Sequence, residues 1–317
     1  MCLSSLPPVP AKVLVSACLA GENCKYNGGN NLNDKVLRLL SSCQVLRFCP
    51  EVQGGLPVPR TPAEICRGVV ITRDGQNVDA QFRSGAFSCL QFALKERPDL
   101  ILLQSRSPSC GVLQHYDGTF SGVLTPGPGI SAQLLLDHHL PVMDIQDFPE
   151  NGLLWTSRLI LRPWLQTDAQ NYLSLAGCSR DGSVCGWPVP CSAQDSGRII
   201  RELLCVPCSY AIVLRETGSP VGGIRLSTYE EGRTLSKPAQ CNLDAWVSAS
   251  SGKDDLLPEA VCAVLQLAFT QLGMEKIRCS CFEKHLPPLF GQDGAPMDES
   301  GKFRIITREH WLKGGFS

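Results

Sequence analysis

The sequence has little of what marks a membrane, secreted or nucleic-acid-binding protein. No apolar run approaches the ~18 residues of a membrane-spanning helix, and the first residues lack the charged region of a signal peptide. The net charge is −1, and charged residues make up only 19% of the chain. This balance argues against a basic groove for nucleic acid. We therefore expect a cytoplasmic protein without membrane or nucleic-acid partners.

Cysteine, in contrast, is abundant. The chain has 17 cysteines, eight up to Cys110 and nine from Cys178 onward. An odd number without a signal peptide argues against a disulfide framework. Metal sites, iron–sulfur clusters and plain buried thiols remain as explanations. Most of the cysteines are expected to be plain, because free cysteine is among the most buried residue types.

The length of 317 residues and a hydrophobic content of 43% fit two domains of ordinary size. We expect a first domain over residues 1–147, a linker over 148–155 and a second domain over 156–317. In the first domain, strand and helix patterns alternate, which predicts a Rossmann-like α/β domain with a parallel sheet. The second domain has a mixed α/β pattern with a strong β-hairpin.

Two local predictions within the first domain concern residues 69–97. The segments Val69–Thr72 and Asn77–Ala80 flank a turn with the sequence RDGQ, which is a β-hairpin signal. Ser84 is expected to cap an amphipathic helix that runs to Arg97.

Three cysteines follow predicted strands of the first domain. The segment KVLVSA (12–17) leads to Cys18, QVLRF (44–48) leads to Cys49, and LILL (100–103) leads through a turn-rich cluster to Cys110. Ligands of open α/β sheets bind outside the carboxyl ends of parallel strands, so we expect the three thiols to converge.

Several sites fit three converging thiols. Structural zinc usually takes four ligands in close pairs, whereas iron–sulfur clusters are held by thiolates, commonly four. With three thiolates, one iron keeps an open position, as catalytic metal sites require. Cys24 is a fourth candidate that closes the site or merely lines it. From the layout alone, three buried structural cysteines remain an equal alternative.

The segments that carry these cysteines also carry a resemblance. They read VSACLAG (15–21), CKYNG (24–28), CPE (49–51), GGLP (54–57), PR (59–60), SPSCG (107–111) and YDGTFSG (116–122). These motifs resemble the bacterial thiouracil desulfidase family, and the similarity spans residues 12–147. The resemblance implies a 4Fe-4S cluster on Cys18, Cys49 and Cys110, whose free iron binds the sulfur of a thiolated base such as 2-thiouracil.

Two polar residues stand near these cysteines. Glu51 follows Cys49 by two residues and is placed to activate water or to protonate a ring nitrogen. Ser107 precedes Cys110 by three residues and is placed to hydrogen-bond the developing charge. The plain alternatives are a salt bridge between Glu51 and Arg60, and a turn hydroxyl at Ser107. The alternative for the whole domain is a non-enzymatic module that handles iron or sulfide.

The second half resembles a different family. The segments RLILRP (158–163), PVGGIR (220–225) and DAWV (244–247) are similar to GNAT acyltransferases, especially the branch that acetylates ribosomal-protein N-termini. The similarity extends over residues 156–312. It implies an N-acetyltransferase that uses acetyl-CoA, which makes the chain bifunctional, although the sequence does not identify the acetyl acceptor.

The resemblance also implies a coenzyme A site. Val247 ends a predicted strand, and Gly252, Lys253 and Asp254 fall in the loop that cradles the pyrophosphate at a helix N-terminus near Leu257. Of the family's glycine-rich loop only Gly252 is present, and the acidic pair at 254–255 brings negative charge to the phosphate position. The alternative is an acyltransferase-like fold that no longer acetylates and instead presents substrate to the first domain.

Overall fold

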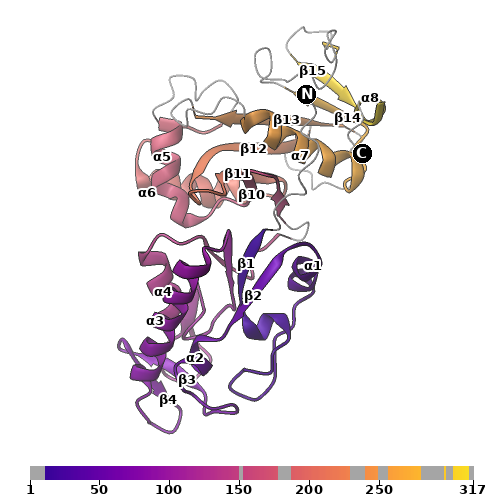
Figure 1. The fold of residues 1–317 in the computed structure, drawn as a ribbon. Helices are drawn as coiled ribbons and strands as arrows, with labels where there is room; N and C mark the ends of the chain where they lie inside the picture. Colours follow the sequence, from indigo (N-terminus) through magenta and orange to yellow (C-terminus); the bar gives the residue numbers. More distant parts are fainter. Residues whose placement is uncertain are drawn as a thin grey trace. The chain divides into compact units, whose positions relative to one another are not determined.

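The computed structural model covers 317 residues (Figure 1). It describes residues 11–149, 153–177, 187–228, 240–248, 256–279, 296–297 and 303–313. The chain divides into two compact units, Met1–Gly152 and Leu153–Ser317. Among the described residues, no helix is long and apolar enough to cross a membrane.

The first unit contains a four-stranded parallel sheet in the order β2-β1-β5-β8. Its strands are β1 (Lys12–Ser16), β2 (Gln44–Phe48), β5 (Leu100–Leu103) and β8 (Val142–Asp144). Every residue of β5 is buried, because helices cover both faces of such a sheet and the strand reads as an uninterrupted apolar run. The predicted parallel α/β sheet is therefore confirmed, and its carboxyl ends lie along one edge.

Helices surround this sheet. They are the 3-10 helix η1 (Ala17–Ala20) and the α-helices α1 (Asp34–Ser42), α2 (Pro50–Gln53), α3 (Asp79–Glu96) and α4 (Ile130–Asp137). Figure 1 shows α3 and α4 on one side of the sheet and α1 on the other. Leu14 and Ile101 of the sheet form a core with Ala93 of α3 and Leu135 of α4. The side chain of Asn33 caps α1 by accepting the backbone N–H of Lys35 at 2.9 Å.

The predicted hairpin partner of Val69–Thr72 is wrong. This segment forms β4, which pairs antiparallel with β3 (Ala63–Cys66). Asn77 makes only an isolated bridge with Ile71. The reason lies in the side chain of Asn77, whose oxygen accepts the backbone N–H of Asp79 at 3.0 Å and turns the chain into a helix.

The same contact moves the start of α3 ahead of the predicted cap at Ser84. The helix begins at Asp79, whose carboxylate accepts the backbone N–H of Val70 at 3.2 Å and pairs with Arg83 one turn later at 2.6 Å. An acidic residue in the first turn of a helix is favoured by the helix dipole. Ser84 instead lies inside α3.

A second two-stranded sheet, besides the β3–β4 pair, completes the first unit. It consists of β6 (Gln114–Tyr116) and β7 (Leu124–Pro126), which pair antiparallel. The turn between them carries the YDGTFSG motif.

The second unit contains a seven-stranded mixed sheet whose strands lie in sequence order. They are β9 (Leu154–Trp155), β10 (Leu159–Arg162), β11 (Ser209–Leu214), β12 (Pro220–Thr228), β13 (Gln240–Val247), β14 (Lys276–Cys279) and β15 (Arg304–Thr307). Among the described strands of this sheet, only β13 and β14 pair in parallel. The last two residues of the expected linker over 148–155 form β9 and pair with β10.

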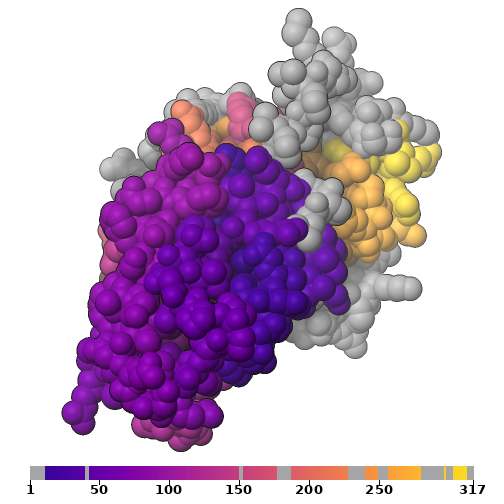
Figure 2. Space-filling view, turned by 60° about the horizontal axis from the view of Figure 1, so that its bottom comes forward, coloured from indigo at the N-terminus to yellow at the C-terminus, as the bar shows by residue number. Residues whose placement is uncertain are grey.

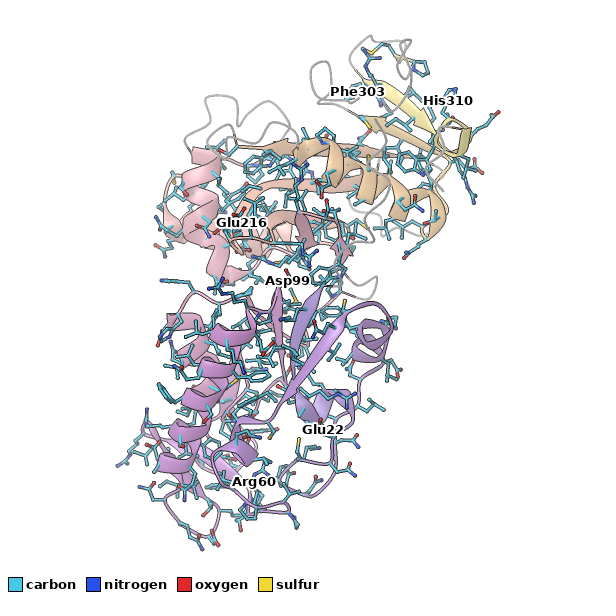
Figure 3. The ribbon with its side chains drawn as sticks, viewed as in Figure 1. Glu22, Arg60, Asp99, Glu216, Phe303 and His310 are labelled. Carbon is cyan, nitrogen blue, oxygen red and sulfur yellow. The ribbon has the colours of Figure 1, made fainter. Side chains whose placement is uncertain are left out.

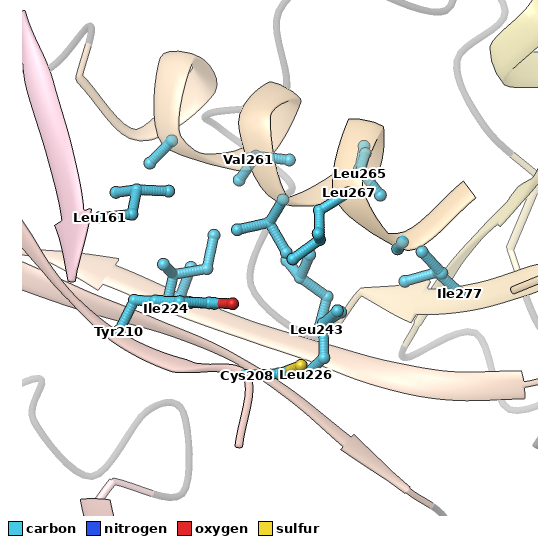
Figure 4. Close-up of a cluster of buried hydrophobic side chains, with 14 of the residues drawn as sticks. Leu161, Cys208, Tyr210, Ile224, Leu226, Leu243, Val261, Leu265, Leu267 and Ile277 are labelled. Atoms are coloured by element: carbon cyan, nitrogen blue, oxygen red, sulfur yellow. The ribbon is translucent and has the colours of Figure 1, made fainter. Parts of the chain in front are cut away.

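The helices of the second unit are η2 (Gln166–Asp168), α5 (Ala169–Gly177), α6 (Ala193–Ile199), the π-helix η3 (Ile200–Leu204), α7 (Leu256–Thr270) and α8 (Arg308–Lys313). Figure 4 shows α7 lying across the sheet, with Val261 and Leu265 of the helix above Ile224 and Leu243 of the strands. All four side chains are fully buried, and each contributes roughly 1.5–3 kcal/mol to folding. α7 begins next to Leu257, where the sequence predicted a helix.

Candidate active site

The carboxyl ends of β1, β2 and β5 open onto a pocket of about 860 Å³. All five residues that the sequence predicted for this site line it, and Cys24 does so as well. The five are Cys18, Cys49, Cys110, Glu51 and Ser107. Figure 3 labels Arg60, another lining residue, among the loops at this end of the unit. Figure 2 views the unit with this end turned forward.

Local structure places Cys18 and Cys49 directly beyond their strands. Cys18 lies in η1, which continues from β1 and ends at Gly21 in the left-handed conformation that suits glycine. Cys49 caps α2, and Pro50 occupies the first helical position, where its missing N–H costs nothing. Both positions follow from the sequence. A short helix that directly follows a strand places the residues at its start in the space beyond the sheet.

Cys110 depends on a tight turn. The hydroxyl of Ser107 accepts the backbone N–H of Ser109 at 3.0 Å and that of Cys110 at 3.1 Å. A Cβ at position 111 would lie 2.6 Å from the carbonyl oxygen of Gln114, so only Gly111 fits there. The plain role predicted for Ser107, a turn hydroxyl, is therefore present together with its place on the pocket wall.

Sequence reasoning missed Asp144, a buried residue at the end of β8. Its carboxylate accepts the hydroxyl of Ser105, the backbone N–H of Gln146 at 2.9 Å and that of Val112 at 3.3 Å. It thereby holds both ends of the turn that carries Cys110. The available signal was a carboxylate at the carboxyl end of a predicted strand.

Cys24 lies beside two of the predicted cysteines. The Cys24 thiol lies within hydrogen-bonding reach of the thiols of Cys18 and Cys49, and the thiol of Cys49 also faces the carbonyl oxygen of Cys24 at 4.0 Å. The contact with Cys18, together with burial, raises the pKa of Cys24 to about 11. The contact with Cys24, followed by burial, raises the pKa of Cys49 well above its usual range, and burial does the same to the pKa of Cys110.

The donors at this pocket are thiols, and the three predicted cysteines do not meet closely enough to share one metal ion. Within the described ranges, no three His, Cys, Asp or Glu side chains are placed to hold one metal ion. A single zinc ion needs all its ligand atoms at about 2.0–2.3 Å from one point, whereas each thiolate of an iron–sulfur cluster is held by a different iron. The pocket presents several thiols and no histidine, which is the ligand chemistry that such clusters use.

Glu51 and Arg60 form an ion pair on the pocket wall. Arg60 donates to Oε2 of Glu51 through Nη2 at 2.7 Å and through Nε at 2.9 Å. The same Nη2 reaches the carbonyl oxygen of Cys24 at 3.1 Å. Only 8% of the Arg60 side chain and 16% of the Glu51 side chain are exposed. The hydroxyl of Ser107 lies 3.4 Å from the other carboxylate oxygen, Oε1.

In the second unit, one residue of the predicted coenzyme A site is described. Val247 is half-buried at the end of β13, and the next residue, Ser248, donates its backbone N–H to the carbonyl of Val221 at 2.8 Å. The other three predicted residues, Gly252, Lys253 and Asp254, lie outside the described residues.

The first turn of α7 carries a buried acid with a structural task. Glu259 accepts the backbone N–H of Arg158 at 2.9 Å, its Nε at 2.6 Å and the hydroxyl of Ser157 at 3.0 Å. It therefore fastens the helix to the start of β10.

Comparisons with known proteins agree with the division of the chain into two units. Residues 13–147 match the family model described as 2-thiouracil desulfurase, and residues 158–287 match the one described as acetyltransferase (GNAT) domain. The uncharacterized protein YbbK of Bacillus subtilis (strain 168) is 36% identical over 133 residues, which is 39% of this chain and 88% of YbbK.

Solved structures give similar matches. The 4Fe-4S-dependent thiouracil desulfidase TudS is 39% identical with a TM-score of 0.42, covering 44% of this chain and 94% of TudS. A GNAT-family acetyltransferase from Bacillus anthracis is 13% identical with a TM-score of 0.39, covering 50% of this chain and 99% of its own. A GCN5-related N-acetyltransferase from Brucella melitensis is 14% identical with a TM-score of 0.38, covering 53% and 83%.

The identity with YbbK covers most of that protein, and the two family models fall on the two units of the structure. Through its first unit the chain belongs to the 2-thiouracil desulfurase family, and its second unit is similar to GNAT acetyltransferase domains.

Proposed function

We propose that the first unit removes sulfur from a thiolated nucleobase such as 2-thiouracil, and that the second unit transfers an acetyl group from acetyl-CoA to an amine. The observation that carries the first proposal is the gathering of Cys18, Cys49 and Cys110 with Glu51 and Ser107 around one pocket. The family model and the name of the 39% identical relative TudS support the same reaction.

In this proposal Cys18, Cys49 and Cys110 hold a 4Fe-4S cluster. When bound, the cluster supplies a soft Lewis acid for the thiocarbonyl sulfur. The three thiols must lose their protons to act as ligands, and the raised pKa values of Cys49 and Cys110 make this loss depend on cluster binding. Cys24 remains a neighbour of two of these cysteines, with its own proton retained at neutral pH.

Glu51 is assigned the proton transfers. The two Arg60 nitrogens that bond to Glu51 both do so at Oε2, so Oε1 is the oxygen that faces Ser107 and is left for a substrate or water proton. Glu51 takes a proton from the attacking water or gives one to a ring nitrogen, and Ser107 turns its one hydroxyl hydrogen from Oε1 of Glu51 to the developing charge. The carbon–sulfur bond breaks, a carbon–oxygen bond forms and hydrosulfide leaves, so no electron is transferred.

The test is sulfide release by the full chain after anaerobic reconstitution with iron and sulfide. We expect equal amounts of hydrosulfide and uracil from 2-thiouracil, without any added reductant. An intact cluster that releases no sulfide from any thiobase would overturn the desulfidase proposal and favour an iron- or sulfide-handling module.

The second activity is tested by titration calorimetry with acetyl-CoA. A helix N-terminus attracts an anion by ~0.3–1 kcal/mol per interaction, and the acidic pair Asp254 and Asp255 opposes this attraction by a similar amount unless Lys253 offsets one charge. We expect weak but measurable binding, which tightens about fivefold when both acids are replaced by asparagine. No binding at millimolar acetyl-CoA would contradict cofactor use and leave a substrate-presenting domain.

A further inference from the structure

The pocket wall formed by the turn between β6 and β7 takes no part in the proton transfers and bond changes proposed above. The turn between β6 and β7 brings Phe120 into the pocket lining, where the residue is half-buried. Its backbone φ is +56°, a left-handed conformation that is rare for a bulky side chain. Such a conformation persists only where the surroundings hold it, and it is found most often at ligand clamps and active sites.

Glu64 of β3 holds this turn. It is only 8% exposed, and its Oε2 accepts two backbone N–H groups, that of Gly118 at 3.0 Å and that of Phe120 at 2.9 Å. The turn also lies directly on β3, since a Cβ at position 118 would be 2.7 Å from the carbonyl oxygen of Ile65. Burying a carboxylate costs desolvation free energy. The two charge-assisted hydrogen bonds to Glu64 offset this cost and fix the backbone of Phe120.

The ring of Phe120 has a second support. The guanidinium of Arg73, just after β4, lies 5.8 Å from the ring centroid, within the range of a cation–π contact. A contact on one face fixes the plane of a ring without using its other face.

Other aromatic residues of the pocket are less suited to contact a ligand. They are Tyr26, Phe48, Phe82 and Tyr116. Phe82 is 1% exposed and packs with Val70 in a small core, and Phe48 packs on Phe92 with ring centroids 5.2 Å apart. Tyr116 is part of β6.

Tyr26 is 46% exposed and lies in the loop that follows Cys24. No contact of its ring matches the two supports of Phe120 among the described residues. It therefore serves as a matched control for an aromatic side chain that lines the same pocket without being held.

We propose that Phe120 is the platform on which the planar ring of the substrate stacks, and that Glu64 and Arg73 are its positioning residues. The inference rests on the proposed function, because it takes the thiolated base as the ligand. Every base has a π-face, so stacking gives binding without selecting among ring substituents. Phe120 then governs the binding of the base, whereas Glu51 and Ser107 govern its chemistry.

The experiment uses the full chain loaded with its cluster, with uracil and 2-thiouracil as probes in titration calorimetry. We expect Phe120→Leu to weaken both affinities about tenfold and Phe120→Trp to stay within about threefold of the wild type. Tyr26→Leu is expected to leave both affinities unchanged. In sulfide release, Phe120→Leu should raise KM and leave kcat within about twofold.

Glu64 gives an independent readout of the positioning role. Because one oxygen accepts both N–H groups, a glutamine amide oxygen can replace it, whereas alanine cannot. Glu64→Ala should weaken uracil binding about as much as Phe120→Leu, and Glu64→Gln should restore it. The double variant Glu64→Ala/Phe120→Leu should be no weaker than either single variant, because both remove the same interaction.

The outcomes separate this inference from the proposed function. Wild-type affinity in Phe120→Leu would overturn the platform, even if sulfide release proceeds. Loss of affinity in Phe120→Leu in a protein that releases no sulfide would support the platform and contradict the desulfidase activity. A wild-type protein that binds neither uracil nor 2-thiouracil would overturn both.

Discussion

In the first unit, Cys18, Cys49 and Cys110 follow strands and line a pocket, and Cys110 also packs in the hydrophobic core there, whereas Cys208 and Cys241 of the second unit are part of its hydrophobic core. Cys241 lies within β13, and Cys208 precedes β11. The described part of the chain thus contains both kinds of cysteine. Cys18, Cys49 and Cys110 come after the carboxyl ends of parallel strands, whereas Cys208 and Cys241 do not.

One ion pair from each unit shows a similar difference in its surroundings. Arg162 and Asp168 of the second unit form a two-pronged pair at 2.7 and 2.9 Å, with side chains only 3% and 5% exposed. Asp168 also accepts the backbone N–H of Leu165 at 2.8 Å. The Arg162–Asp168 pair is almost fully buried, whereas the Glu51–Arg60 pair lines the pocket. We therefore expect the first to act on stability and the second on reaction rate.

The largest expected effect is on sulfide release when a cysteine that lines the pocket is replaced. A core cysteine of the second unit provides the control. Cys110→Ser should reduce sulfide release to the background rate, because the cluster loses a ligand. Cys241→Ala should keep the rate within about twofold, because it removes only a small apolar side chain from the other unit. A desulfidase that is unaffected by Cys110→Ser, measured under the same anaerobic conditions, would show that this cysteine is structural too.

The next effect concerns Glu51. Glu51→Gln should lower kcat by roughly 10²–10⁴ while iron content is unchanged, since the amide cannot exchange the proton. Glu96→Gln is the matched control, because Glu96 pairs with Lys12 at 3.2 Å at the amino end of β1, away from the pocket. Full activity of Glu51→Gln would remove this residue from the mechanism and leave its pairing with Arg60 as its only role.

A third effect is on stability alone. Asp168→Asn leaves Arg162 as a buried charge without its carboxylate partner, which should destabilise the second unit by about 3–5 kcal/mol. Urea unfolding followed by tryptophan fluorescence reports this unit, because all five tryptophans lie at or beyond Trp155. Sulfide release by the folded variant should equal that of the wild type. A parallel loss of sulfide release at low temperature would contradict the division of labour between the two pairs.

The smallest effect is a pH dependence of the second unit. Burial raises the pKa of Cys241 from 9.0 to about 12, while the thiol in the unfolded chain ionises near its ordinary value. Stability from the protonated thiol is therefore complete below pH 9 and is lost as the pH rises toward 12. Between pH 8 and 10 the wild type should lose about 1 kcal/mol more than Cys241→Ala, measured by urea unfolding at each pH. Equal losses would show that Cys241 is accessible to solvent.

The parts of the first unit that the sequence predicted correctly depend on local patterns. Buried parallel strands read as apolar runs, so LILL at 100–103 indicated both the strand and the residues that must follow it. The placement of Cys18 and Cys49 near the sheet edge needed no further information. Their roles as ligands stay a prediction, as do the roles of Glu51 and Ser107.

What the sequence left open depends on contacts between distant residues. Asn77 had two competing local choices, a strand or a turn into a helix, and its bond to Asp79 decided between them. Asp144 and Glu64 act on turns 32 or more residues away in the chain. A single carboxylate in a predicted strand does not show which N–H groups it will meet.

The most direct test of the central claim is the iron and acid-labile sulfide content of the full chain, purified or reconstituted without oxygen. We expect about four of each per chain. The content should fall sharply in Cys18→Ser, Cys49→Ser and Cys110→Ser and stay unchanged in Cys241→Ala. One metal ion per chain, or the same iron content in all four variants, would contradict a cluster held by the three cysteines that follow the strands.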